Sequence, residues 1–216
     1  MNIKQLTLAA IAVTTGAAMA AMPEVSNVTM TQAANRLVTI TYQLTEAAVV
    51  TLDIETNANP SAAADDPGWT SIGGAAICNA EGDVWKKVGE SGTFNGSITW
   101  RPDHSWKDYV GNGFKIAANG ARARVTAWPL DNTPAYMVVD VSAGAEANTQ
   151  KYYPSADFVP GGVSDGLYKT TMFLMRKIMA KGVTWTMGST TLETRRNATR
   201  EATHQVSLTN NPKNRS

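Results

Sequence analysis

Apolar and polar residues alternate over several short stretches between residues 25 and 141. The alternation is strictest at 37–44, where four apolar side chains share one face: Val38, Ile40, Tyr42 and Leu44. The same period runs through 25–30, 49–55, 96–101, 121–128 and 136–141, with a seventh candidate at 84–88. A two-residue period rich in β-branched residues is typical of half-buried strands, so each stretch predicts a short strand.

Turn-rich sequence separates these strands, and none of them carries a sustained helical stripe. The breaks at 57–68, 111–113 and 131–134 are rich in Pro, Gly, Asn and Asp. Short strands at this spacing are typical of a sandwich of two sheets. We therefore expect a mainly β fold, with an antiparallel immunoglobulin- or fibronectin-III-like β-sandwich at 22–145. On the strand at 49–55 the apolar positions should face the core and the polar positions solvent: Val50, Leu52 and Ile54 inward, Thr51, Asp53 and Glu55 outward.

The start of the chain has the layout of a secretory signal peptide. Lys4 is the only charge in 1–20, a mostly apolar run follows at 6–13, and the stretch ends in small residues around Met19. The apolar run is shorter than the roughly 20 residues that a membrane span needs. We expect 1–20 to be a signal peptide, the mature protein to be exported (periplasm, cell surface or secreted), and no membrane span. A buried N-terminal helix is the competing interpretation.

Composition narrows the chemistry that the chain can carry. The sequence is 43% apolar and 17% charged, unlike a disordered chain. Its one cysteine, Cys78, excludes an internal disulfide framework and a cysteine-only metal site, and is either a buried small hydrophobe or a reactive thiol. The net charge of +1 gives no overall basic footprint for nucleic acid, so we expect no nucleic-acid partner.

Five of the six tryptophans fall between residues 69 and 128. Large aromatic side chains dominate protein cores, and we expect Trp100 and Trp128 to fill the core. Trp69 and Trp106 lie in loop-like sequence and are the candidates for a binding surface, where aromatic rings stack on sugars.

The polar residues that could form a metal or catalytic site are weaker candidates than the tryptophans. Four carboxylates lie in or near expected loops and are candidate calcium ligands, although they lack EF-hand spacing and also fit a solvated loop: Asp65, Asp66, Glu81 and Asp83. His104 stands between Asp103 and Ser105, but neighbours in sequence do not make a triad, whose members meet in space. No catalytic, cofactor-binding or metal-ligating residue is therefore assigned.

The charge balance changes near residue 150. Lys and Arg number 8 against 14 Asp and Glu in 21–150, and 10 against 4 in 151–216. This asymmetry supports a domain boundary, with a linker and approach segment at 146–181. Within it 152–166 is rich in Pro and Gly, and 170–181 fits a short helix or a strand pair equally well. Further on, 182–189 and 204–209 are typical of strands.

Two linked motifs near the end of the chain resemble a known family. They are GVTWTMGS at 182–189 and REATHQVSLT at 200–209, with Glu193 between them. This is similar to the opening of the formylglycine-generating (sulfatase-modifying factor) domain, an α+β domain that begins with a strand closing in F-x-M-G-S and continues to E-x-P-x-H-x-V-x-L. Trp185 replaces the usual phenylalanine, and Ala202 and Thr203 stand where a proline is common. The stretch 25–143 also resembles the exported sandwich attached to such domains.

The resemblance implies a parent family that oxidises a sulfatase cysteine to formylglycine, or related nonheme-iron enzymes. The family's copper or iron, its calcium and its catalytic cysteines belong to residues downstream of this motif, so we expect no cofactor in this chain and an incomplete domain start at 182–216. The chain would then be a non-catalytic N-terminal part, with the sandwich as spacer or recognition module. A free-standing sandwich that binds glycans is the alternative. A cell-surface glycan or protein is the expected partner.

Overall fold

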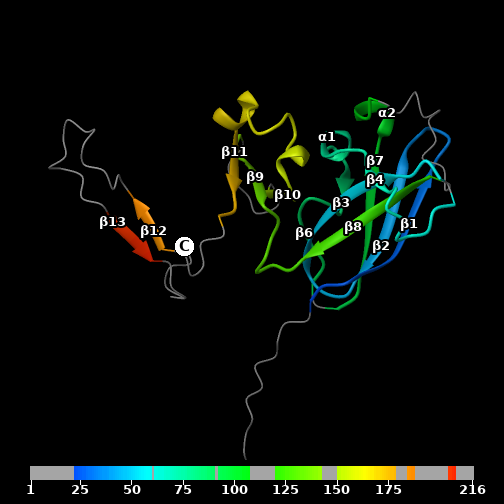
Figure 1. The fold of residues 1–216 in the computed structure, drawn as a ribbon, viewed down its shortest axis with the longest axis horizontal. Coiled ribbons are helices and arrows are strands. Elements are labelled where there is room, and N and C mark those ends of the chain that lie inside the picture. The colour runs from blue at the N-terminus through cyan, green and yellow to red at the C-terminus, as the bar shows by residue number, and fades with distance from the viewer. Residues whose placement is uncertain are drawn as a thin grey trace, which may run out of the picture.

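The computed structural model describes residues 22–59, 61–90, 92–107, 120–142 and 150–178, together with the backbone of 184–187 and 204–207. Within these ranges the chain is mainly β, and its strands form antiparallel sheets (Figure 1). The expected signal peptide at 1–20 lies outside the described residues. The strands predicted by alternation are all formed, although the candidate at 84–88 is reduced to the short β6 (Lys87–Val88).

The first sheet has four strands in the order β1-β2-β7-β5. They are β1 (Val25–Gln32), β2 (Val38–Leu44), β7 (Phe94–Trp100) and β5 (Glu81–Gly82). Every second residue of β2 is buried, as its alternation predicts, and β2 pairs with β7 in unbroken register from end to end. This sheet therefore turns one apolar face inward.

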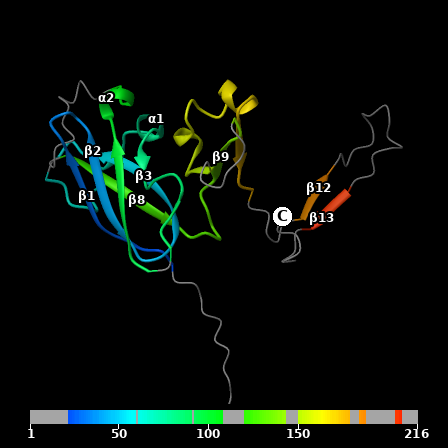
Figure 2. The same ribbon diagram turned by 180° about the vertical axis from the view of Figure 1, so that it is seen from behind.

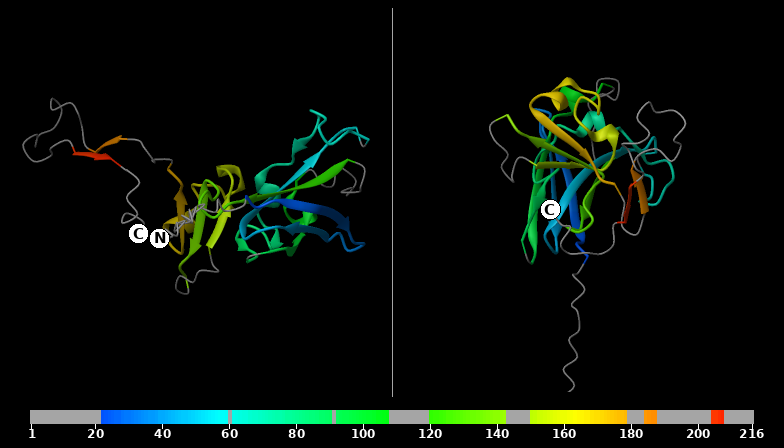
Figure 3. Two further views of the ribbon diagram at one scale, coloured as in Figure 1. Left: turned by 90° about the horizontal axis from the view of Figure 1, so that it is seen from below. Right: turned by 90° about the vertical axis from the view of Figure 1, so that its left-hand side faces the viewer.

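The second sheet is built around β3 (Ala48–Thr56). One edge of β3 pairs along its length with β8 (Ala121–Trp128), and the other edge pairs with β4 (Thr70–Ser71) and β6. Seen from below, the blue strands of the first sheet and the cyan and green strands of the second form separate layers (Figure 3). The two sheets share one core, with two one-turn helices, α1 (Gly74–Ile77) and α2 (Pro102–Ser105), at one end.

The core depends on a close fit between Tyr42 and Gly96, which lie opposite each other on β2 and β7. The Tyr42 ring occupies the place where a side chain at residue 96 would begin, because a Cβ there would overlap the ring. The Tyr42 hydroxyl donates a hydrogen bond to the Asp83 carbonyl oxygen at 2.7 Å. A large aromatic residue is thus accommodated in the first sheet by the absence of a side chain on its partner strand.

The outer face of β3 differs from the expected solvent-facing surface. Thr51 is 4% exposed and Glu55 is 7% exposed. The Trp128 indole N–H donates to Thr51 Oγ1 at 2.9 Å, and the Arg122 Nε donates to Glu55 Oε2 at 2.6 Å. The prediction that these two residues face solvent was wrong because long side chains from the neighbouring strand β8 fold over them.

A third sheet follows the first two. Its central strand β9 (Tyr136–Asp140) pairs with β10 (Gln150–Tyr153) on one side and β11 (Met172–Arg176) on the other. The predicted strand at 136–141 is formed, but it pairs here and not in the predicted sandwich. The domain boundary placed at 145 therefore falls inside one sheet, and much of the expected linker at 146–181 is folded.

This third sheet lies beside the first two when viewed from the front and from behind (Figures 1 and 2). Two short 3₁₀ helices, η2 (Ala156–Phe158) and η3 (Gly166–Lys169), lie between β10 and β11 in the chain. Tyr153 and Val159 belong to the same buried cluster as the first two sheets, so the third sheet is packed against them.

Near the end of the chain, β12 (Thr184–Met187) and β13 (His204–Ser207) pair antiparallel. Their register sets Met187 opposite His204 and Trp185 opposite Val206. Both strands were predicted from the sequence, and their existence is confirmed.

Candidate functional site

A cleft of about 590 Å³ lies where the third sheet meets the end of α1. Its walls come from three stretches that are far apart in the sequence: residues 78–81, one face of the third sheet, and residues between 160 and 168. A concave, partly apolar space lined by a few polar groups is the usual form of a ligand site in a protein. We therefore take this cleft as the candidate functional site.

The pairing register of the third sheet determines which of its side chains line the cleft. Val138 lies opposite Lys151, and Asp140 lies opposite Met172. Alternate residues of a strand share a face, so these four side chains and Tyr153 all lie on the face that lines the cleft. The residues between them, including Phe173, are on the other face of the sheet.

Tyr153 supplies the most deeply buried polar group of the cleft. Its side chain is 1% exposed, and its ring packs against the Trp85 indole with the centroids 5.3 Å apart. Burial raises the pKa of its hydroxyl, and the neighbouring Cys78 and Tyr168 raise that pKa further. No hydrogen bond joins this hydroxyl to another described residue. The hydroxyl therefore lies near two other cleft residues and is available to hydrogen-bond to a ligand.

Cys78 and Tyr168 both lie near that hydroxyl. The Tyr168 hydroxyl donates to the Pro160 carbonyl oxygen at 2.7 Å, so its proton is already in use. Burial raises the pKa of the Cys78 thiol, which the nearby Lys151 ammonium lowers only in part, and the thiol lies 3.6 Å from the Ala75 carbonyl oxygen. A protonated, half-buried thiol is a poor nucleophile, and this environment favours binding over covalent catalysis.

Charge in the cleft is mainly negative. Three carboxylates and one ammonium line it: Glu81, Asp140, Asp165 and Lys151. Hydrogen bonds from Ser142, including one of 2.9 Å from its backbone N–H, hold the pKa of Asp140 below its ordinary value. Asp165 accepts a bond of 2.8 Å from the Leu167 N–H and so caps η3. Local backbone bonds thus fix the orientation of two of these carboxylates.

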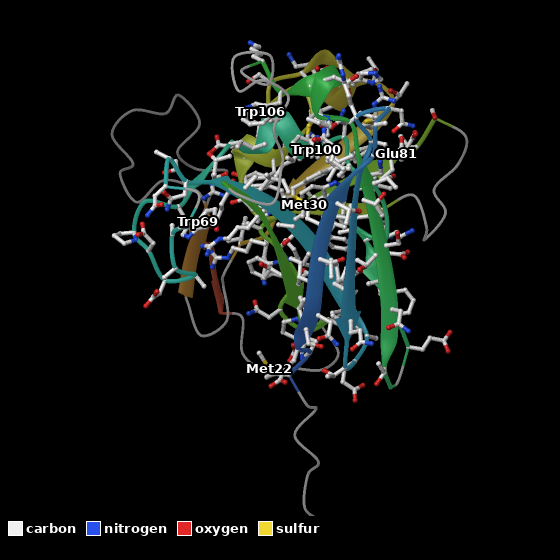
Figure 4. The ribbon with its side chains drawn as sticks, turned by 90° about the vertical axis from the view of Figure 1, so that its right-hand side faces the viewer. Met22, Met30, Trp69, Glu81, Trp100 and Trp106 are labelled. Atoms are coloured by element: carbon white, nitrogen blue, oxygen red, sulfur yellow. The ribbon has the colours of Figure 1, made fainter. Side chains whose placement is uncertain are left out.

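The two tryptophans that sequence reasoning chose for a binding surface lie elsewhere (Figure 4). Trp69 is half-buried on the loop before β4, and its indole N–H donates to the Ala63 carbonyl oxygen at 2.8 Å. The Arg122 guanidinium lies 4.2 Å from the centroid of its ring. One face of Trp69 is therefore occupied by a cation of the protein itself.

Trp106 is buried, and the expectation that it lies on the surface was wrong. It is 9% exposed and packs on Trp100 with the ring centroids 6.4 Å apart. The short α2 turns the chain back so that Trp106 meets the core, while the Ser105 hydroxyl donates to the Ala76 carbonyl oxygen at 2.6 Å. Trp100 is buried as expected, and its indole N–H donates to the same oxygen at 2.8 Å.

The candidate calcium ligands are dispersed. Asp66 accepts bonds from Asn57 and the Gly68 N–H, while Asp83 accepts the Ser97 N–H and pairs with Lys86. In the part of the chain that the structure describes, no three His, Cys, Asp or Glu side chains gather as a metal site. His104 is exposed on α2, 3.9 Å from the Asp103 carboxylate.

Comparisons with protein-family models, with curated proteins and with solved structures find no match for this chain. The candidate site therefore rests on its own geometry. Across the described ranges, no helix has the length and apolar character needed to cross a membrane.

Sequence reasoning missed most of the cleft. Lys151, Tyr153 and Asp165 received no role because they lie beyond a boundary placed at 145, and Asp140 received none because it ends a strand that was assigned to the sandwich. One signal was available: two consecutive tyrosines at 152 and 153, a residue type enriched in strands, come directly before a Pro/Gly-rich stretch.

Proposed function

We propose that this chain is a non-catalytic recognition module of an exported protein of the formylglycine-generating type, and that the cleft holds its ligand. The observation that carries the proposal is the cleft of about 590 Å³, which Tyr153 lines and in which its hydroxyl has no partner among the described residues. A bound ligand would hydrogen-bond to this hydroxyl, which can both donate and accept.

The strand order supports an immunoglobulin-like sandwich for the first two sheets. In constant-type immunoglobulin domains, strands A, B, E and D form one sheet and C and F lie in the other. The order β1-β2-β7-β5 reproduces A-B-E-D in position and in chain order, and the β3–β8 pair corresponds to C and F. This class of fold is commonly a carrier of binding surfaces, which fits a recognition module.

The β12–β13 pair supports the family resemblance. The Met-Gly-Ser motif and the His-x-Val-x-Leu motif are separated in sequence, and their strands pair with Met187 opposite His204. A two-stranded pair is marginal in isolation. The family's copper or iron finds no ligand set among the described residues, and we derive no step through a metal.

Glycan binding through tryptophan is less well supported. Trp106 is buried, and Trp69 already carries Arg122 over its ring. Saccharide binding is therefore kept as an outcome of the test below.

The test is calorimetric titration of the purified protein with three probe classes: short basic peptides, short acidic peptides and neutral oligosaccharides. We expect at least one class to bind, and Leu167→Trp to abolish that binding by filling the cleft. Leu167 is half exposed and its backbone N–H, which bonds to Asp165, is unchanged by the substitution. Val163→Trp is the matched control, because Val163 is similarly exposed and does not line the cleft.

A second assay tests the proposal that the chain is non-catalytic. The protein is incubated with a cysteine peptide of the sulfatase type, copper and oxygen, and the peptide mass is measured. We expect no formylglycine. Oxidation of the peptide, or binding that is the same in Leu167→Trp as in the unchanged protein, would contradict the proposal.

A further inference from the structure

The cleft combines an apolar wall with an excess of negative charge. Val138, Met172 and Leu167 provide hydrocarbon surface, while Glu81, Asp140 and Asp165 outnumber the single Lys151. A charge excess of this sign attracts a cation and disfavours an anion. The occupant should therefore have a hydrocarbon body and a positively charged end.

Arginine and lysine side chains have this composition. Their methylene stems pack on apolar surface while the charged head reaches polar groups. A guanidinium or ammonium would meet carboxylates that are already oriented by backbone bonds, as Asp140 is by Ser142 and Asp165 by Leu167. Bonds between a cation and a carboxylate are stronger than neutral ones, and the Tyr153 hydroxyl adds a polar partner deeper in the cleft.

The third sheet indicates that this side chain is presented by a polypeptide. Met172 lines the cleft and belongs to β11, and β11 pairs only with β9 among the described strands. The other edge is less open, because the Tyr152 N–H of β10 already donates to the Trp85 carbonyl oxygen at 2.7 Å. An unpaired strand edge can add an extended peptide through backbone hydrogen bonds.

The outer face of β11 supports the same partner. Phe173 is 62% exposed, and Met175, which shares its face of β11, is also exposed. These side chains would pack against alternate apolar residues of an added strand, whose backbone direction would carry one side chain toward the cleft beside Met172.

We propose that the cleft binds an arginine or lysine side chain of an extended polypeptide partner that pairs with the edge of β11. This inference rests on the proposed function, because it names the ligand class of the same cleft. Recognition of the basic side chain comes from Glu81, Asp140 and Asp165, and the hydrocarbon stem lies on Val138 and Met172.

The test uses three capped pentapeptides, Gly-Val-X-Val-Gly, in which X is arginine, glutamate or leucine. Calorimetric titration should give binding of the arginine peptide at least tenfold tighter than of the other two. Asp140→Asn should weaken the arginine peptide about tenfold and leave the leucine peptide unchanged, since asparagine can still accept the Ser142 bond. Glu81→Gln should act in the same direction, and Lys151→Glu should tighten binding of the arginine peptide.

Glu24→Gln is the control for net charge. It removes one exposed negative charge before β1, away from the cleft, and should leave all three affinities unchanged. Circular dichroism and the melting temperature of each variant separate a loss of folding from a loss of binding.

The outcomes separate this inference from the proposed function. Equal affinity for the arginine and glutamate peptides, no effect of Asp140→Asn, or binding of a neutral oligosaccharide alone would overturn the inference and leave a ligand in the cleft. No binding of any peptide or saccharide would overturn both.

Discussion

The indole of Trp85 packs against the phenol of Tyr153, and this pair joins the third sheet to the core of the first two. The ring centroids are 5.3 Å apart, and the centroid of the Phe158 ring lies 5.9 Å from that of the indole. The backbone N–H of Trp85 donates to the Val50 carbonyl oxygen of β3. The backbone N–H of Tyr152, in β10, donates to the Trp85 carbonyl oxygen. Trp85 has a φ of +60°, a left-handed conformation that is uncommon for a bulky residue and is held here by bonds on both sides.

Removing the Trp85 indole should therefore loosen the third sheet. We expect Trp85→Ala to lower the free energy of unfolding by about 3–5 kcal/mol, because it opens a cavity beside Tyr153 and Phe158. Trp85→Phe should cost clearly less, since a ring remains and the indole N–H, which is buried without a partner among the described residues, is lost. Urea unfolding measures both. Equal losses would show that the ring contacts contribute little.

Substitution of Gly96 tests the fit of Tyr42 in the first sheet. Gly96→Ala places a Cβ where the Tyr42 ring lies, so the ring must move or the strands must separate. Overpacking of this kind costs about 1–3 kcal/mol. Gly166→Ala is the control, because its Cβ would enter open space, and should change stability by less than about 0.5 kcal/mol. Thermal unfolding should give a clearly lower melting temperature for Gly96→Ala than for Gly166→Ala.

Glu55 was expected on a solvent-exposed face, where a single charge contributes little to stability. Its burial predicts a larger contribution. It is nearly buried and accepts bonds from Arg122 at 2.6 Å and from Arg124 at 3.3 Å. Glu55→Gln removes the charge from these bonds and should cost about 1–3 kcal/mol. Arg124→Met should cost less than about 1 kcal/mol, because the Arg124 side chain is 68% exposed. Chemical denaturation measures the loss of unfolding free energy in both variants. A larger loss in Arg124→Met than in Glu55→Gln would contradict the burial of Glu55.

Alkaline pH should destabilise the fold through Tyr42. Burial, with a smaller contribution from the Asp83 carboxylate, raises the pKa of Tyr42 well above its ordinary value of 10.0. The unfolded chain then releases this proton near pH 10, whereas the folded chain keeps it, so the free energy of unfolding is unaffected below about pH 10 and falls as pH rises further. Tyr153 contributes in the same direction.

Urea unfolding at about pH 8 and about pH 11 measures this dependence. Tyr42→Phe loses the bond to the Asp83 carbonyl oxygen and should be less stable at the lower pH. Its loss between the two pH values should nevertheless be smaller than in the unchanged protein. The same loss in both proteins would show that Tyr42 is not the responsible group.

The candidate site was less accessible to sequence reasoning than the strands were. Trp106 was expected on a surface because it lies in loop-like sequence, yet α2 turns it onto Trp100 in the core. Tyr153 was assigned to a connector, and its role depends on Trp85, which is distant in the chain. Side chains that meet from separate strands leave no local pattern by which they could be chosen.

The sequence by itself determined where the strands form. For strands that are buried on one side, it also determined which face points to the core. The alternation at Val38 and Ile40 is a local property of a pleated strand, and the structure confirms it. Only the tertiary structure decided which strand edges pair and what covers the other faces. Thr51 and Glu55 have polar side chains and are buried because Trp128 and Arg122 reach them from β8. Pairing and coverage depend on contacts between residues far apart in the chain, whereas alternation depends only on neighbours.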